Sequence, residues 1–256
     1  MPGLPSTCKI LHVDGLRILV ASPLGPIIRP ALASRFPGGT VTVAQDPGQV
    51  ERAVRGQLRH DVVVSDLMWN SEAEFSFDGL DVLEVLRSAE RLSPVVMATQ
   101  GHGLEADHLE EVLARPEVRA VYRKSDGPQV LFDVVTAVAA GGAVLPEPHP
   151  APAPTIHGWF GHGRGRTAAR MAGAIASGRA SSHRTLAEAA NVRYDTAAKV
   201  GREYLGELIW RRGEHTEPTV PASVVYRWCG EHARYVLSWC RRNGHADVAT
   251  RVVGRR

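Results

Sequence analysis

The chain has 256 residues, an ordinary globular composition and a formal net charge of +3 that is unevenly distributed. Residues 1–150 contain 13 Lys and Arg against 19 Asp and Glu, whereas residues 151–256 contain 17 against 8. The basic second half favours a polyanionic partner, nucleic acid before a membrane surface. No apolar run approaches the length that would cross a bilayer, so the sequence argues against a membrane-spanning protein.

The sequence also indicates a compartment. Its first residues lack the basic start and long apolar segment of a signal peptide, so we expect a cytoplasmic protein. Three cysteines, Cys8, Cys229 and Cys240, form no disulfide framework, which agrees with a reducing compartment.

Apolar segments alternate with helix-like segments between residues 17 and 145. The expected strands cover 17–21, 40–44, 61–65, 94–98 and 119–122. The expected helices cover 24–36, 50–58, 79–91, 104–114 and 128–140. Several strands are apolar throughout, as in a parallel sheet that is covered on both faces. The sequence therefore predicts an α/β domain over residues 17–145, preceded by an extension over residues 1–16.

Asp66 ends the third of these strands and is the main candidate for a functional residue. In open α/β sheets, ligands and chemistry collect beyond the carboxyl ends of the strands. Other polar residues end neighbouring strands: Ser22 follows the first, Thr99 the fourth and Lys124 the fifth. We expect these four side chains to share one pocket.

These positions, together with the segments 78–83 (Asp-Gly-Leu-Asp-Val-Leu) and 138–145, resemble the receiver domains of bacterial response regulators of the NarL/LuxR type. The resemblance covers roughly residues 17–147 and implies a flavodoxin-like, doubly wound (βα)5 fold. It also implies that Asp66 stands where a phospho-acceptor stands. In such domains the lysine, here Lys124, neutralises the new charge, and the hydroxyl of Thr99 turns toward the phosphate.

The resemblance fails at the end of the first strand. The family binds Mg²⁺ through an acidic pair there, whereas this chain has Ala21, Ser22 and Pro23. We therefore predict an atypical receiver that lacks its metal site and is controlled by dimerisation or by a small-molecule ligand. There are two alternatives. Asp66 only forms an ion pair with Lys124, or Asp66 is phosphorylated in the conventional way.

Three further features bear on the expected pocket. Asp14 is a weaker candidate to replace the missing acids. The loop after Asp66 is long and carries the aromatic residues Trp69, Phe75 and Phe77, which are expected to cover the pocket. Val121 stands three residues before Lys124, where the family has an aromatic switch residue, and Tyr122 is one place away.

A segment rich in proline and then glycine, residues 146–166, predicts a linker between two domains. We expect His157 and His162 within it to be solvated. Helical pattern returns from Thr167 and predicts an all-α domain over residues 167–256, beginning with a helix at 170–177.

The pattern between residues 185 and 209 predicts a helix-turn-helix. A short helix at 185–190 is followed by Asn191, a plausible left-handed cap, and then by a longer helix capped by Asp195 or Thr196. Such a second helix fits the DNA major groove. The residues expected to contact DNA are Arg193, Tyr194, Thr196, Lys199 and Arg202. A plain amphipathic bundle with a solvated basic face is the alternative.

This segment also resembles, less closely, the DNA-binding domain of the same regulators, through Ser177-Gly178, Ser181-Ser182, Leu186-Ala187 and Thr196. Beyond it, the sequence predicts an extra helix at about 222–242 with a broad apolar stripe, for which core contacts are preferred over a dimer surface. Cys229, His232, Cys240 and His245 could imitate a zinc site, but their spacing is unusual, so no metal and no cofactor is expected.

The sequence as a whole thus predicts a homodimeric regulator of transcription that binds double-stranded DNA and is not an enzyme. The alternatives are an RNA-binding antiterminator, a phosphoryl-transfer enzyme that uses Asp66, and a receiver that serves only to dock proteins.

Overall fold

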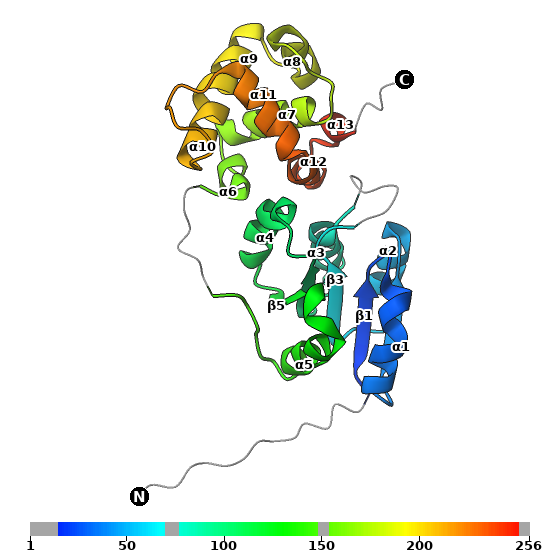
Figure 1. Cartoon of the computed structure of the whole chain (residues 1–256). Helices are drawn as coiled ribbons and strands as arrows, with labels where there is room; N and C mark the ends of the chain where they lie inside the picture. Colours follow the sequence, from blue (N-terminus) through cyan, green and yellow to red (C-terminus); the bar gives the residue numbers. More distant parts are fainter. Residues whose placement is uncertain (1–14, 70–76, 148–153, 251–256) are drawn as a thin grey trace, which may run out of the picture.

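The computed structural model describes residues 15–69, 77–147 and 154–250. Asp14, Phe75, Cys8 and the strand-like part of the predicted extension lie outside these ranges. Figure 1 shows an α/β domain followed by a helical domain, with the two domains in contact. Within the described residues, no helix is long and apolar enough to cross a membrane.

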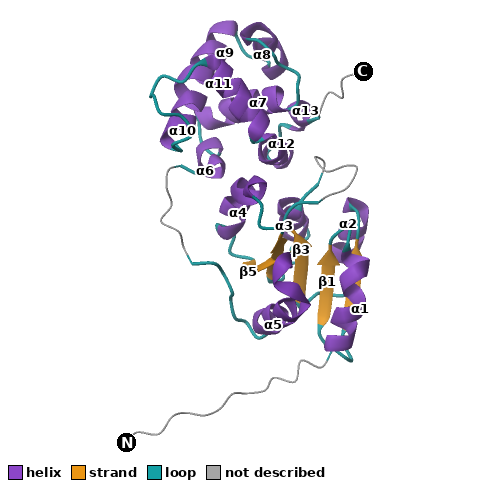
Figure 2. Ribbon diagram, viewed as in Figure 1, coloured by secondary structure: helices purple, strands orange, loops and turns teal. Residues whose placement is uncertain are grey.

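The N-terminal domain is built on a sheet of five parallel strands in the order β2-β1-β3-β4-β5 (Figure 2). This is the flavodoxin-like order, and it confirms the predicted fold. The strands are β1 (Arg17–Ala21), β2 (Thr40–Ala44), β3 (Val62–Asp66), β4 (Val95–Thr99) and β5 (Val118–Arg123).

Helices cover both faces of the sheet, because its central strands are apolar on both sides. One face packs against α1 (Gly25–Arg35) and α5 (Gly127–Ala139). The other packs against α2 (Pro47–Arg55), α3 (Gly79–Ser88) and α4 (Ala106–Leu113). Short 3-10 turns, η1 (Gly103–Glu105) and η2 (Lys124–Asp126), follow β4 and β5.

Local sequence fixes the start of α3 close to the end of β3. Asp78 and Asp81 form a reciprocal capping box, in which each carboxylate accepts a hydrogen bond from the other residue's backbone N–H. Gly79 begins the helix beside the carbonyl oxygen of Asp66, and a Cβ there would come within 2.7 Å of that oxygen. Any larger residue would push α3 away from the strand.

The C-terminal domain is entirely helical in its described part. It contains α6 (Ile156–Phe160), α7 (Arg164–Ala176), α8 (His183–Ala190), α9 (Tyr194–Val200), a π-helical segment η3 (Gly201–Leu205), α10 (Gly206–Arg211), α11 (Ala222–Glu231), α12 (Ala233–Arg242) and α13 (Ala246–Ala249). The predicted all-α class is therefore confirmed.

Three predicted segments differ from the structure. The single helix expected at about 222–242 is two helices that break at His232, whose backbone lies outside helical values (φ −93°, ψ 13°). The predicted linker contains a helical turn, α6, because Ile156 and Phe160 are fully buried in the hydrophobic core. Helix α7 likewise starts six residues before the predicted first helix, at Arg164.

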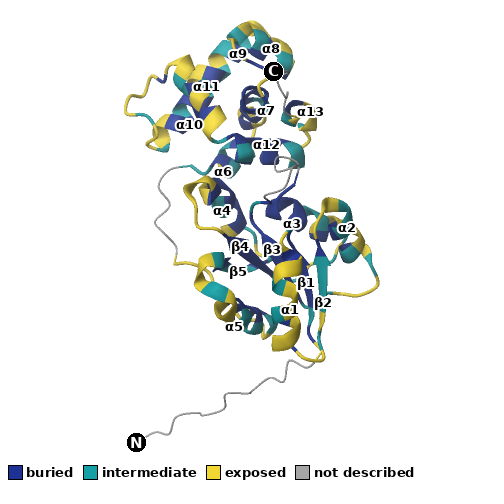
Figure 3. Ribbon diagram, turned by 45° about the vertical axis from the view of Figure 1, so that its right-hand side comes forward, coloured by how far each residue is buried: buried dark blue, intermediate teal, exposed yellow. Residues whose placement is uncertain are grey.

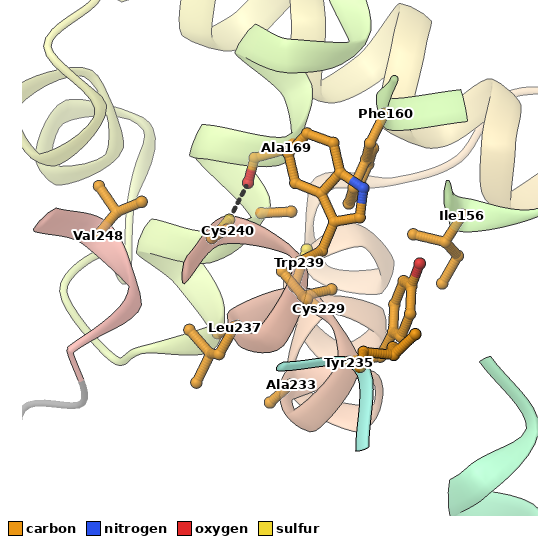
Figure 4. Close-up of a cluster of buried hydrophobic side chains, with 14 of the residues drawn as sticks. Ile156, Phe160, Ala169, Cys229, Ala233, Tyr235, Leu237, Trp239, Cys240 and Val248 are labelled. Atoms are coloured by element: carbon orange, nitrogen blue, oxygen red, sulfur yellow. Dashed lines mark hydrogen bonds between the residues drawn. The ribbon is translucent and has the colours of Figure 1, made fainter. Parts of the chain in front are cut away.

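The two domains share a hydrophobic core. Figure 3 shows buried residues on α3 of the first domain and on α12 of the second, where the domains meet. In Figure 4, Trp239 of α12 lies beside Phe160 of α6, and Tyr235 lies near Ile156. One continuous cluster of buried side chains runs from the α2–α3 face of the sheet into this helical core.

Candidate functional site

Three of the four predicted pocket residues lie together at the carboxyl end of the sheet. The Ser22 hydroxyl donates a hydrogen bond to Oδ2 of Asp66 at 2.6 Å. The Lys124 ammonium lies 2.8 Å from Oδ1 of Asp66. Both carboxylate oxygens of Asp66, which is only 6% exposed, therefore have a partner from the chain itself.

A cavity of about 280 Å³ opens beside Ser22, Asp66 and Lys124, which we call the Asp66 triad, on the side of the sheet covered by α1 and α5. Apart from the triad and Tyr122, its walls are apolar: Val20, Leu24, Ile27, Ile28, Val64, Ala98, Pro128 and Leu131. Such a mixture of apolar walls and a few polar groups is typical of sites for small organic molecules.

Thr99 does not join this cavity. Its neighbour Ala98 lines the cavity, and because successive side chains of a strand alternate between faces, Thr99 belongs to the other side. It lines a separate hollow together with Glu105 and Val121. The Glu105 carboxylate accepts hydrogen bonds from the N–H groups of the loop after β4, including that of Gly101 at 2.8 Å, and so ties this loop down.

The residues present do not fit a Mg²⁺ site of the receiver type. Mg²⁺ takes several oxygen ligands, chiefly carboxylates and water. Here β1 ends in Ala21, with Ser22 and Pro23 after it, which leaves Asp66 as the single carboxylate that lines the cavity among the residues that the structure describes. The ammonium of Lys124 already balances its charge.

Two of the three aromatic residues expected to cover the pocket lie elsewhere, and the third, Phe75, is outside the described residues. Trp69 and Phe77 pack edge to face, with ring centroids 4.9 Å apart, in the hydrophobic cluster on the opposite face of the sheet. Tyr122 does line the cavity, and its hydroxyl donates to the carbonyl oxygen of Gly127 at 2.9 Å.

The helix-turn-helix geometry follows from two local signals. Ser182 caps α8 and forms a reciprocal capping box with Thr185. Asn191 ends α8 in the left-handed conformation (φ 52°, ψ 51°), as predicted. Helix α9 then begins at Tyr194 with Arg193 at the N-cap, two or three residues before the predicted cap at Asp195 or Thr196, because the turn at Asn191 closes within three residues.

The predicted DNA-contacting side chains lie mainly on the surface of α9 and η3. Arg193 is exposed, Tyr194 is 58% exposed, and the side chains of Lys199 and Arg202 are 61% and 67% exposed. Thr196 is half-buried. Helices α8 and α9 lie at the end of the helical domain that is farthest from the sheet (Figure 1), so this surface does not face the N-terminal domain.

A network of buried charges between the domains has no counterpart among the sequence-predicted sites. At its centre is Glu111 of α4, which is fully buried and accepts two hydrogen bonds from Arg242, at 2.7 and 2.8 Å, and one from the hydroxyl of Tyr235 at 2.8 Å. Burial alone would raise the pKa of Glu111, but the adjacent imidazole of His157 and the hydrogen bonds from Arg242 lower it well below its ordinary value.

His157 is part of this network rather than a solvated linker residue. Its Nδ1 lies 3.5 Å from Oε1 of Glu111, because the turn α6 places it against α4. Sequence spacing does not indicate this contact, since 46 positions separate the two residues.

A second group in the interface surrounds His232, at the break between α11 and α12. Its Nδ1 contacts Asp107, and its Nε2 contacts Glu214 at 3.0 Å. Arg212 joins the same carboxylates, with 2.8 Å to Asp107 and 2.6 Å to Glu214. Burial opposes the charged imidazole, but the hydrogen bonds with Asp107 and Glu214 raise the pKa of His232 to about 9. His232 is therefore protonated at neutral pH.

Arg241 forms the third group, at the capping box of α3. Its guanidinium contacts Asp78 at 3.3 Å and also Asp81. Burial and the adjacent carboxylate of Asp78 raise the pKa of Asp81, against the effect of Arg241. The same two acids that begin α3 thus also anchor the helical domain.

The residues considered for zinc do not form a metal site. The Cys229 and Cys240 thiols are fully buried, and burial raises the pKa of both, to about 12 for Cys240. His232 is committed to Asp107 and Glu214, while His245 stacks on Trp239. Across the described ranges, no cluster of three or more His, Cys, Asp or Glu side chains is arranged to hold a metal ion.

Comparisons with known proteins give matches among solved structures alone. No protein-family profile matches the sequence, and no curated protein is similar to it. A LuxR-family two-component response regulator from Aurantimonas sp. SI85-9A1 is similar over 53% of this chain and 91% of its own, with 25% identity and a TM-score of 0.42. The RcsB response regulator of Salmonella typhimurium is 13% identical over 84% of this chain and 98% of its own, with a TM-score of 0.45.

A structure of an RcsB–DNA complex is also similar, over 84% of this chain and 99% of that one, with 13% identity and a TM-score of 0.46.

Proposed function

We propose that the protein is a DNA-binding regulator of transcription whose receiver-like domain responds to a small-molecule ligand or to dimerisation, and not to phosphorylation of Asp66. In this proposal the chain has no enzymatic activity of its own and acts as a homodimer on double-stranded DNA.

The observation that carries DNA binding is the exposed, basic front of α9, which follows a tight turn at Asn191. Lys199 and Arg202 extend into solvent from consecutive turns and would meet phosphates or base edges in a major groove. Glu203 lies within 4 Å of both and holds their charge only weakly, at 3.9 and 3.8 Å.

Control without phosphorylation is supported by the environment of Asp66. A nucleophilic carboxylate needs a metal to bring the phosphodonor close and to balance charge. Asp66 has instead a hydrogen bond from Ser22 and an ion pair with Lys124. Thr99 lies on the other side of the strand, and Glu105 fixes the loop that would have to move.

Control by a ligand is supported by the cavity beside Asp66. Its walls are mainly apolar, and Leu24 and Ile27 at its mouth are 52% and 76% exposed. Their exposure leaves apolar surface that either a bound molecule or a second copy of the chain would cover.

The test is binding of the full-length protein to genomic DNA fragments, followed by substitution of residues in α9 and its N-cap, which together we call the reader helix. Replacing Arg193 or Lys199 with Ala should weaken binding to a selected fragment about tenfold, and loss of a phosphate contact should reduce the salt dependence by about one unit of slope. Arg55→Ala, an equal loss of charge at the exposed end of α2, serves as the control.

Unchanged affinity in both reader variants would reject α9 as the DNA-contacting helix. The same assay should include structured RNA as a competitor. If RNA displaces the DNA at equimolar concentration, the helical domain is an RNA-binding module of an antiterminator and the proposal of DNA recognition is wrong.

A further inference from the structure

The helical domain contains its own cavity directly behind the reader helix. It encloses about 290 Å³ between α8, α9 with η3, and the start of α11. Most of its wall is apolar, contributed by Ile175, Leu186, Val220 and Val225. Four residues with polar side chains also line it: His183, Arg202, Thr219 and Tyr226.

The hydroxyl of Tyr226 is the feature that suggests a ligand. Its oxygen is buried and has no hydrogen-bond partner among the residues that the structure describes. A buried hydroxyl without a partner costs about 1–3 kcal/mol, so such groups are normally satisfied by the protein, by water or by a ligand. Burial also raises the pKa of Tyr226, which keeps this hydroxyl a hydrogen-bond donor at neutral pH.

The backbone around the cavity is irregular where it meets the reader helix. Gly201 begins the π-helical segment η3, and a Cβ at Gly201 would meet no atom closer than 3.9 Å. Short π-helical segments inside α-helices often occur at functional sites. Here the segment joins α9 to α10 and places Arg202 on the cavity rim.

We propose that this cavity binds a small aromatic carboxylate. The apolar walls suit fused rings, because the volume is about twice that of a 150 Å³ cavity that accommodates benzene. The Tyr226 hydroxyl donates to one carboxylate oxygen, while the guanidinium of Arg202, which also lines the cavity, supplies positive charge. No covalent chemistry is involved.

Occupancy of this cavity would act on DNA binding through Arg202. Arg202 lines the cavity and is also one of the proposed DNA contacts, so a bound carboxylate competes with phosphate for its guanidinium. This second part of the inference rests on the proposed function, whereas binding of the carboxylate does not.

The probe for the experiment is 2-naphthoate, titrated against the full-length protein without DNA and followed by its fluorescence and by saturation-transfer NMR. We expect saturable binding that Tyr226→Phe weakens about tenfold, as expected for loss of a hydrogen bond to a charged group. The matched control is Tyr122→Phe, which removes a hydroxyl from the receiver-like cavity and should leave binding unchanged. Naphthalene, which lacks the acceptor, should bind native protein and Tyr226→Phe equally.

A second variant, Ala198→Leu, fills the cavity from α9 and should abolish binding, with folding checked by circular dichroism. No binding of 2-naphthoate to the native protein, or binding unaffected by both Tyr226→Phe and Ala198→Leu, would overturn the assignment. If 2-naphthoate binds as expected but the protein retains no DNA, the cavity stands and the proposed function fails. If DNA binds and 2-naphthoate does not, the reverse holds.

Discussion

The N-terminal domain carries two groups of buried charge that differ in extent and in purpose. The group at Asp66 contains one carboxylate, one ammonium and one hydroxyl beside an open cavity. The group on α3 and α4 contains several carboxylates that meet arginines and histidines of the helical domain. Asp66 at the end of β3 thus takes part in few electrostatic interactions, whereas the more extensive charge network joins the two domains.

Position and chemistry are therefore separable. Asp66 keeps its place at the end of β3 because the fold puts a strand end there. Its reactivity depends on neighbours from other strands, and here Ser22 and Lys124 occupy both of its carboxylate oxygens.

The largest expected effect is at the centre of the interface. Glu111→Gln would leave the guanidinium of Arg242, which is 3% exposed, buried without a counter-charge. Breaking a buried pair in this way should lower the free energy of unfolding by about 3–5 kcal/mol. The measurement is urea-induced unfolding followed by tryptophan fluorescence.

The adjacent residue supplies the control. Glu110 pairs with the same domain through Arg212, but its side chain is 37% exposed. Glu110→Gln should therefore cost about 1 kcal/mol or less. If Glu111→Gln and Glu110→Gln lowered the free energy of unfolding equally, burial of Glu111 would add no stability to the interface.

A smaller effect should follow the ionisation of His232. Its pKa in the folded protein is about 9, above the ordinary value of 6.5, so its contribution to stability is complete below about pH 6.5. That contribution should disappear as the pH rises through 9 and should amount to roughly 3 kcal/mol at most. The difference in unfolding free energy between the native protein and His232→Gln, measured from pH 6 to about pH 10, isolates it from other titrating groups.

A pH-independent difference between these two proteins would mean that His232 is neutral in the interface. In that case Asp107 and Glu214 would be held by Arg212 alone.

The smallest effect is expected at Asp66. Asp66→Asn weakens an ion pair with Lys124, whose side chain is 26% exposed, and should change stability by about 1 kcal/mol or less. Incubation of the native protein with Mg²⁺ and a small-molecule phosphodonor should give no stable phosphate on Asp66 by intact-mass analysis. A stoichiometric mass increase that Asp66→Asn removes would contradict the proposal of control without phosphorylation.

A variant designed to gain metal binding tests the same difference between the two charge groups. Ser22→Asp would place a second carboxylate beside the first and so restore part of the missing metal site. On addition of Mg²⁺, this variant should show quenching of its tryptophan fluorescence or changes in its NMR chemical shifts that the native protein lacks.

The sequence predicted what depends on local patterns. The five strands, the parallel sheet and the joint location of Ser22, Asp66 and Lys124 followed from where apolar runs end. The left-handed turn at Asn191 followed from residue type. Thr99 was placed in the wrong cavity because a difference of one residue at a strand end moves a side chain to the other face.

The interface could not be predicted in the same way, because it depends on tertiary contacts. Glu111 and Arg242 are 131 positions apart, and Asp107 and His232 are 125 apart. The five-residue turn α6 forms where Ile156 and Phe160 find a core to enter. No proline near His232 indicates the break between α11 and α12. The break coincides with side-chain contacts that only the folded protein provides.

The hydrophobic cluster that crosses the domain boundary bears on how the protein comes apart. Because side chains from the sheet, α6 and α12 belong to one buried cluster, exposing one domain's share would strip the other of its partners. Structural domains and cooperative unfolding units need not coincide. Here the two domains should melt in a single calorimetric transition, and fragments cut between residues 147 and 154 would each carry an uncovered apolar face and tend to aggregate.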